Sequence, residues 1–263
     1  MDVPPILVSI IDRIDNPLRK RKLSNKDALE QLCFLLKTGV PWRHIPLKGC
    51  SSSAVYKRYR HWLSLDVFDK AWVELTSLYA QSRLKTNPSW FHDLFIDTTM
   101  IKNVGGVDGL GKNPTDRGRL ATKMGVVVDN AAIPIALQFF EANRNDVTTT
   151  MPTVEQIPCA LRKDRRYKHA LIGDKGYISK DVADALKRIS MRLVTPRKTN
   201  SRMKPNTKKD EQRLQRRHKV ENLFCRLDKF KKIHCRHEKS LKSFKALTIF
   251  GMMFLIATST VPF

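Results

Sequence analysis

The segment Ala170–Tyr177, with the sequence ALIGDKGY, is a short apolar run that ends on an acidic residue close to two glycines. Such a run is typical of a buried β-strand, and in α/β proteins ligands bind in the crevice beyond the carboxyl ends of the strands. Asp174 therefore lies where a catalytic carboxylate would stand. Gly173 and Gly176 would let the chain turn there, because glycine tolerates a positive φ. This segment is equally compatible with a structural alternative, in which Asp174 caps the helix that follows.

The chain is strongly basic, with 49 Lys and Arg against 25 Asp and Glu in 263 residues and a net charge of +24. A protein with this charge attracts polyanions, so nucleic acid is the first expected partner and an anionic membrane surface the second. Residues 1–90, 91–160 and 161–263 carry net charges of +7, −2 and +19. A slightly acidic middle between basic flanks suits an acidic catalytic centre with basic walls.

Cysteine usage and hydropathy narrow the class of protein. Five scattered cysteines without a C-x-x-C pair indicate reduced thiols in an intracellular protein. They are Cys33, Cys50, Cys159, Cys225 and Cys235. The nearby run His234–His237 has the spacing of no common zinc module. The apolar run Ala246–Thr258 is shorter than the ~20 residues that cross a bilayer, so we expect a buried helix and no membrane partner.

Residues 1–89 are expected to form a small all-α domain. Ser24 can cap a first helix because an acid stands three residues later, and the tight connector Trp42–Pro46 leads to a second helix over about Ser52–Leu63. This second helix is both basic and aromatic, a pattern typical of a helix-turn-helix DNA reader. Its candidate DNA contacts are Lys57, Arg58 and Arg60. The alternative is a small helical bundle with a charged outer face.

Residues 90–263 are expected to form a second domain of the α/β class, with a mixed sheet. In chain order we expect a strand around Asp97, a hairpin over 120–141, a helix from Asp146, the strand ending at Asp174, a helix, a strand, and a helix over 211–232 that carries Glu221. Three antiparallel strands followed by alternating helices and strands is the order of a ribonuclease H-like fold. In that fold the first strand, the strand after the first helix and a late helix converge at one edge.

Three acids at one edge would form a metal site. Carboxylates at close range repel one another, and two divalent ions relieve this repulsion while they activate a nucleophile and stabilise a leaving oxygen in phosphodiester chemistry. Mg²⁺ or Mn²⁺ suits oxygen ligands best. Asp97 would bridge both ions, Asp174 would complete one side, and Glu221 would reach in from its helix. Each acid also has an ordinary alternative role. Asp97 could lie in a turn, and Asp174 could cap a helix. Glu221 could form an ion pair with Arg217 or Arg226.

Several short motifs occur together in one order. They are Gly39–Arg43 with the helix over 56–62, Leu94–Thr99, Thr122-Lys123 leading to Val126–Asp129, Ile172–Tyr177, Pro196–Lys198, and Arg217–Glu221 with Phe224 and Arg226-Leu227. In this combination, over about 24–255, the sequence resembles insertion-sequence transposases with a DDE catalytic domain, of the compact bacterial kind with a short helical N-terminal domain. The resemblance implies that Asp97, Asp174 and Glu221 are the catalytic metal ligands.

The resemblance also implies the reaction and its partners. Such a protein binds the terminal inverted repeats of a mobile element, cleaves phosphodiester bonds and joins the freed 3′-hydroxyl ends to target DNA. It acts as a homo-oligomer that pairs both ends, in the bacterial cytoplasm on the nucleoid. Implied DNA contacts of the catalytic domain are Lys123, Lys175, Arg197, Lys198, Arg217 and Arg226.

The chain departs from the usual pattern of this family at four positions. It has Gly125 and Asn145 where histidine is common, Leu214 where tyrosine is often found, and Asp228 where lysine usually stands. These departures keep two alternatives open. One is a weakened or inactive, transposase-derived DNA-binding protein, and the other is a ribonuclease H-like nuclease without strand transfer.

Overall fold

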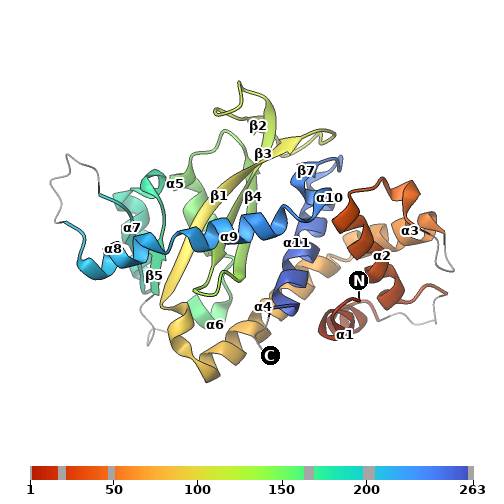
Figure 1. Cartoon of the computed structure of the whole chain (residues 1–263), viewed down its shortest axis with the longest axis horizontal. Helices are drawn as coiled ribbons and strands as arrows, with labels where there is room; N and C mark the ends of the chain where they lie inside the picture. Colours follow the sequence, from red (N-terminus) through yellow and green to blue (C-terminus); the bar gives the residue numbers. More distant parts are fainter. Residues whose placement is uncertain (1, 17–21, 47–50, 163–168, 198–204, 260–263) are drawn as a thin grey trace. The chain divides into compact units, whose positions relative to one another are not determined.

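A computed structural model describes residues 2–16, 22–46, 51–162, 169–197 and 205–259 (Figure 1). Its contacts divide the chain into two compact units. Unit 1 consists of residues 1–76, 102–108 and 226–262, and unit 2 of residues 77–101 and 109–225 with residue 263. Each unit thus draws on separated segments of the chain. The functional division between residues 89 and 90 stays a prediction.

Unit 2 is built on a mixed sheet (Figure 1). Strand β1 lies between β3 and β5, β6 pairs with β5, and both β2 and β4 pair with β3. Strands β1, β5 and β6 are parallel, whereas β3 is antiparallel to β2 and β4. This is the predicted ribonuclease H-like arrangement in an α/β protein. The strands are β1 (Asp93–Asn103), β2 (Gly111–Lys112), β3 (Leu120–Val128), β4 (Pro134–Glu141), β5 (His169–Ile172) and β6 (Met191–Val194).

The register between β1 and β5 positions two of the predicted acids. Phe95 of β1 pairs with Ile172 of β5. The residues of both strands that lead up to this pair are buried. Asp97 and Asp174 each lie two residues beyond this pair. Because parallel strands run in step, both carboxylates are delivered to the same end of the sheet.

The helices of unit 2 correct one expectation, that a single helix runs over 211–232. The chain instead makes two helices, because the N–H groups of Arg216 and Arg217 donate to carbonyls three residues back and so form a tighter turn. Arg213 and Arg216 both pair with the carboxylate of Asp93, which holds this turn. The helices are α5 (Asp146–Val154), α6 (Cys159–Arg162), α7 (Lys180–Arg188), α8 (Lys208–Gln215) and α9 (His218–Leu227, shared with unit 1), with 3₁₀ turns η2 (Pro88–Phe91) and η3 (Lys175–Tyr177).

Unit 1 is mainly helical. Ser24 and Ser51 accept hydrogen bonds from the N–H groups of Asp27 and Ala54, and these caps begin α2 and α3 close to the predicted positions. The elements are α1 (Pro5–Ile14), α2 (Asn25–Thr38), η1 (Trp42–His44), α3 (Ser52–Ser64), α4 (Val67–Thr86, continuing into unit 2), α10 (Lys231–His234), β7 (Cys235–Arg236) and α11 (Leu241–Ala257). The apolar helix α11 is buried, as predicted. Within the described ranges, no helix combines the length and the apolar character that crossing a membrane requires.

The turn between β3 and β4 depends on one buried carboxylate. Asp129 Oδ1 accepts hydrogen bonds from the N–H groups of Ala131, at 2.8 Å, and Ile133, at 3.0 Å, while Oδ2 accepts from the hydroxyl of Tyr79. All three donors belong to unit 2.

We therefore predict that Asp129→Ala lowers the free energy of unfolding by about 3 kcal/mol, because it leaves buried donors without an acceptor. Urea denaturation measures the change. Glu155→Ala, which removes an exposed carboxylate of the same unit, is the matched control and should change stability by less than about 0.5 kcal/mol. Equal losses in the two variants would contradict the structural role of Asp129.

Candidate active site

Asp97 is much less exposed than Glu221. It lies in the middle of β1, its side chain is 20% exposed, and its Oδ1 accepts a hydrogen bond of 2.8 Å from the N–H of Thr98. Burial raises the pKa of Asp97 to about 6, and the negative charges of Asp174 and Asp146 add to the effect, while Thr98 and Arg217 oppose it. Asp97 therefore lies within electrostatic reach of two other carboxylates.

Asp174 caps the turn that follows it, and its catalytic role stays a prediction. Its Oδ1 accepts a hydrogen bond of 2.7 Å from the N–H of Gly176 and so caps η3. The negative charge of the same carboxylate contributes to the raised pKa of Asp97. A helix cap and a place in the site are therefore compatible.

The two glycines of this loop serve a different purpose from the expected one. Neither has a positive φ, so that part of the prediction is wrong. A Cβ on Gly176 would lie 2.9 Å from Asp174 Oδ1 and 3.3 Å from Asp146 Oδ2, and a Cβ on Gly173 would lie 2.8 Å from the ring of Tyr177. Glycine is needed here because these side chains occupy the space.

Glu221 is linked to Asp97 through an arginine. Arg217 Nη1 donates to Asp97 Oδ2 at 3.1 Å, and Arg217 Nη2 lies 3.2 Å from Glu221 Oε1. The turn before α9 places Arg217 near β1, and Glu221 follows one helical turn later. The Glu221 side chain is 54% exposed, so the guanidinium is its connection to the sheet edge.

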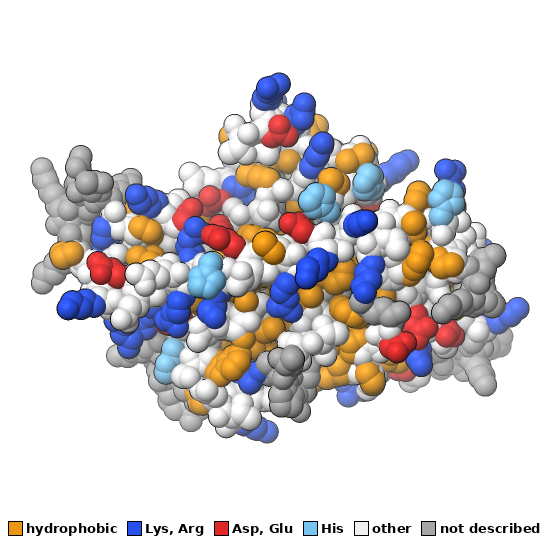
Figure 2. Space-filling model, viewed as in Figure 1, with side chains coloured by type: hydrophobic (Ala, Val, Ile, Leu, Met, Phe, Trp, Pro, Cys, Tyr) orange, Lys and Arg blue, Asp and Glu red, His pale blue; other side chains and the backbone are white. Residues whose placement is uncertain are grey.

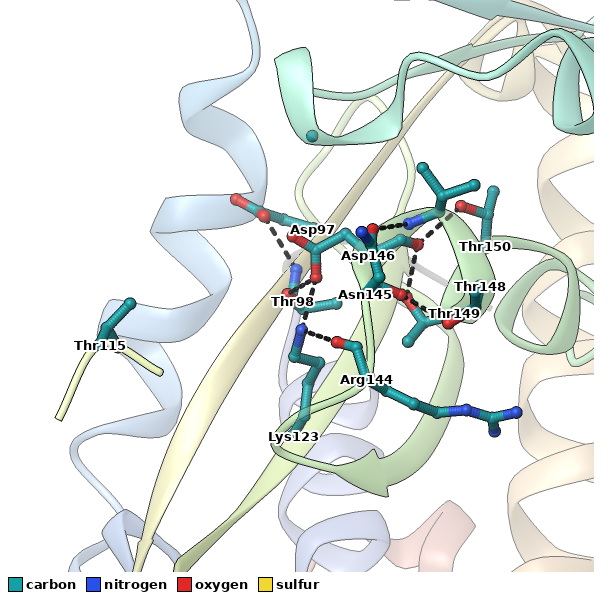
Figure 3. Close-up of polar contacts among 12 residues, drawn as sticks. Asp97, Thr98, Thr115, Lys123, Arg144, Asn145, Asp146, Thr148, Thr149 and Thr150 are labelled. Carbon is teal, nitrogen blue, oxygen red and sulfur yellow. Dashed lines mark hydrogen bonds and ion pairs between the residues drawn. The ribbon is translucent and has the colours of Figure 1, made fainter. Parts of the chain in front are cut away.

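Asp146 is a fourth acid of this site, and sequence analysis treated it only as the start of a helix. Its Oδ1 accepts hydrogen bonds from Thr98 Oγ1, at 2.9 Å, and from Lys123 Nζ, at 2.8 Å. Figure 3 shows the side chains of Thr98, Lys123 and Asp146 meeting, with the Asp97 carboxylate beside the backbone of Thr98. The position of Asp146 shortly after the β3–β4 hairpin could have indicated that it belongs to the site. Aspartate is also common at helix starts, however, because it caps them. We call Asp97, Asp146, Asp174 and Glu221 the carboxylate site.

The donor set fits a hard divalent cation. Carboxylate oxygens are the preferred ligands of Mg²⁺ and Mn²⁺, and burial is the main cause of the raised pKa of Asp97. In the structure Arg217 provides a positive charge between Asp97 and Glu221. Among the described residues, no three acidic, histidine or cysteine side chains are arranged as a metal-binding group.

Two of the predicted DNA contacts prove to be internal. Arg58 is 9% exposed, and its guanidinium donates to Asn25 and to the carbonyl of Leu23. Lys123 is 4% exposed and donates to the carbonyl of Arg144 as well as to Asp146. Both side chains are thus engaged inside the fold and are not available as DNA contacts.

The other predicted DNA contacts fall into three groups. Lys57, Arg60, Lys175 and Arg197 are exposed. Arg217 belongs to the carboxylate site, and Arg226 donates to the carbonyl of Leu255 at 3.3 Å. Lys198 lies outside the described residues. Over β1 and α9, Figure 2 shows acidic side chains bordered by Lys and Arg.

Comparison with known proteins identifies related sequences for both parts of the chain. Residues 93–256 match the family model described as "Transposase DDE domain", and residues 7–72 match "Putative transposase of IS4/5 family". The first match contains β1, β5 and α9 and hence the whole carboxylate site. The second contains α2 and α3.

Two relatives come from Burkholderia cepacia. The "Insertion element IS402 uncharacterized 16.2 kDa protein" is 30% identical over 115 residues, which cover 43% of this chain and 75% of that protein. The "Putative transposase for insertion sequence element IS402" is 36% identical over 81 residues, 29% of this chain and 38% of the relative. Among solved structures, a piggyBac transposase synaptic complex with hairpin DNA has a TM-score of 0.44 and 12% identity, over 97% of this chain and 69% of that one.

We predict that Lys123 and Asp146 stabilise each other. Lys123→Met should lower the free energy of unfolding by about 2 kcal/mol, because it leaves the Asp146 carboxylate without its buried partner. In a double-mutant cycle with Asp146→Asn, measured by urea denaturation, the coupling energy should be about 1–2 kcal/mol.

The exposed pair Lys187 and Asp184, 3.2 Å apart, is the matched control. Its coupling energy should stay below about 0.5 kcal/mol, since exposed pairs are screened by water. Additive effects of the two changes at Lys123 and Asp146 would contradict the role of Lys123 as an internal partner.

Proposed function

This chain belongs to the transposase DDE-domain family, and we propose that it is a DNA transposase that cleaves phosphodiester bonds at element ends and joins the 3′-hydroxyl ends to target DNA. The observation that carries the proposal is the gathering of Asp97, Asp146 and Asp174 at one end of the sheet, with Arg217 connecting Asp97 to Glu221. The family match supports a transposase, and the reaction on DNA is the proposed step.

The three predicted acids would hold two Mg²⁺ or Mn²⁺ ions. Such ions, when bound, activate the attacking oxygen and stabilise the leaving oxygen of the phosphodiester. Asp97 provides the enclosed carboxylate on a rigid strand, Asp174 is fixed by its bond to Gly176, and Glu221 is the exposed carboxylate next to solvent. A rigid strand and a fixed loop keep the ligands in place without reorganisation.

Two cations of the chain itself prepare this site. Arg217 offsets the repulsion between Asp97 and Glu221 and holds the Glu221 side chain toward β1. Lys123 does the same for Asp146, which keeps that acid beside Thr98. Two cations thus position the carboxylates: the partly exposed Arg217 and the buried Lys123.

We further propose that the helical region within residues 1–89 binds the terminal inverted repeats. Lys57 and Arg60 of α3 are exposed, and their side chains make no hydrogen bond or ion pair with other described residues. Unpaired cations on one helix suit contacts with DNA phosphates. Residues 90–263 would then act on the bound DNA, with Lys175 and Arg197 as phosphate contacts and with a second copy of the chain on the other end of the element. The bacterial setting of the relatives suits action on nucleoid DNA.

The catalytic proposal predicts the effect of single changes. Asp97→Ala, Asp174→Ala and Glu221→Ala should each lower Mn²⁺-dependent cleavage of a terminal-repeat duplex by at least about 100-fold, which corresponds to about 2.7 kcal/mol of barrier. Glu155→Ala should cleave like the unchanged protein. Cleavage that persists in all three variants would exclude this site, and cleavage without joining of a pre-cut 3′ end would favour a nuclease.

The DNA-binding proposal predicts the salt dependence of affinity. One lost phosphate contact in Lys57→Ala should reduce the slope of log K against log salt by about 1, because fewer counterions are released. Fluorescence anisotropy with the terminal-repeat duplex measures the slope. Lys85→Ala, an exposed lysine of α4 that is not assigned to DNA, should leave it unchanged, and a slope that is equally unaltered in Lys57→Ala would argue against α3 as the reader.

A further inference from the structure

Unit 1 contains a cavity of about 570 Å³ whose lining residues all belong to that unit, whereas the carboxylate site belongs to unit 2. Its volume is in the range of small-molecule sites, about 300–1,000 Å³. The walls come from η1, from α3 and from the segment before and at the start of α11. The lining residues that matter here are Trp42, Tyr56, Arg60, Glu238, Lys239 and Ser243. We call this cavity the Trp42 pocket.

The aromatic wall of the Trp42 pocket is held rigidly. Trp42 Nε1 donates to Glu238 Oε1 at 3.0 Å, and its ring is 4.8 Å from the buried ring of Tyr59. Tyr56 meets the same indole edge-on at 5.1 Å and is 39% exposed. A fixed aromatic surface that is partly open to solvent can stack on a flat ligand without loss of side-chain entropy.

The charge of the pocket is positive toward solvent. Glu238 is already occupied, because its Oε2 accepts a hydrogen bond of 2.7 Å from Ser243 and its Oε1 lies 3.4 Å from Lys232 Nζ. The side chains of Arg60 and Lys239 are exposed and form no hydrogen bond or ion pair with the part of the chain that the structure describes. The free charges at the pocket are therefore cationic and suit an anionic group of the ligand.

We propose that the Trp42 pocket binds one unpaired nucleotide of a DNA strand. The base would stack on one of the two rings, Trp42 or Tyr56, and meet the other edge-on, and the flanking phosphates would pair with Arg60 and Lys239. Base stacking on aromatic side chains and phosphate pairing with cations are the two components of single-strand binding, and a base inside a duplex is not available to such a pocket. The assignment rests on the proposed action on DNA and gives the segment around Trp42 a role separate from catalysis.

Fluorescence anisotropy with three probes tests this assignment: a blunt duplex, the same duplex with a three-nucleotide overhang, and the single strand dT6. The unchanged protein should bind the overhang duplex about 10-fold more tightly than the blunt one. Tyr56→Ala and Trp42→Ala should abolish this preference while blunt-duplex affinity stays unchanged. Tyr56→Phe, which keeps the ring, should retain the preference, as should Phe34→Ala, an exposed aromatic of unit 1 outside the pocket.

The outcomes separate the pocket from the proposed function. Blunt-duplex binding with no preference for the overhang, or a preference that survives Tyr56→Ala with a normal circular dichroism spectrum, would overturn the pocket assignment alone. Binding of dT6 and of the overhang duplex without binding of the blunt duplex would support the pocket and contradict the transposase proposal. Displacement of the overhang probe by thymidine monophosphate as readily as by dT6 would assign the pocket to free nucleotides and overturn its assignment to DNA.

Discussion

Mutual repulsion among carboxylates is the constraint on which unit 2 depends. Parallel pairing of β1 and β5 delivers Asp97 and Asp174 to one end of the sheet, and Asp146 joins them from the start of α5. Such a group is unfavourable without positive charge. Arg217 and Lys123 provide that charge. The proposed reaction further requires divalent metal ions at the carboxylates.

The sheet could be predicted because its signals are local. An apolar run precedes Asp97, another precedes Asp174, and a hairpin lies between the two runs. These local patterns predict the strands in their order along the chain. The break before α9 could not be predicted, because it depends on ion pairs of Arg213 and Arg216 with Asp93, more than a hundred residues away in sequence. A local helical pattern contains no information about such a partner.

Charge alone also misled the assignment of individual side chains. Arg58 and Lys123 contribute to the basic character of the chain, yet both are buried and used internally. Asp146 was underestimated for the opposite reason, since one acid at a helix start is ordinary. The Trp42 pocket was beyond reach of pattern analysis, because Trp42 and Glu238 are 196 residues apart. In each case the role of the residue depends on a tertiary contact that its type and its sequence neighbours do not reveal.

The central claim is that the carboxylate site holds divalent ions. Crystals of the unchanged protein soaked in Mn²⁺ would test it most directly, through anomalous scattering of the metal. We expect two anomalous peaks at the carboxylate site, with Asp97, Asp174 and Glu221 as the residues that hold the ions. A map without a peak at Asp97, with Arg217 still joining Asp97 to Glu221 at saturating Mn²⁺, would contradict the account.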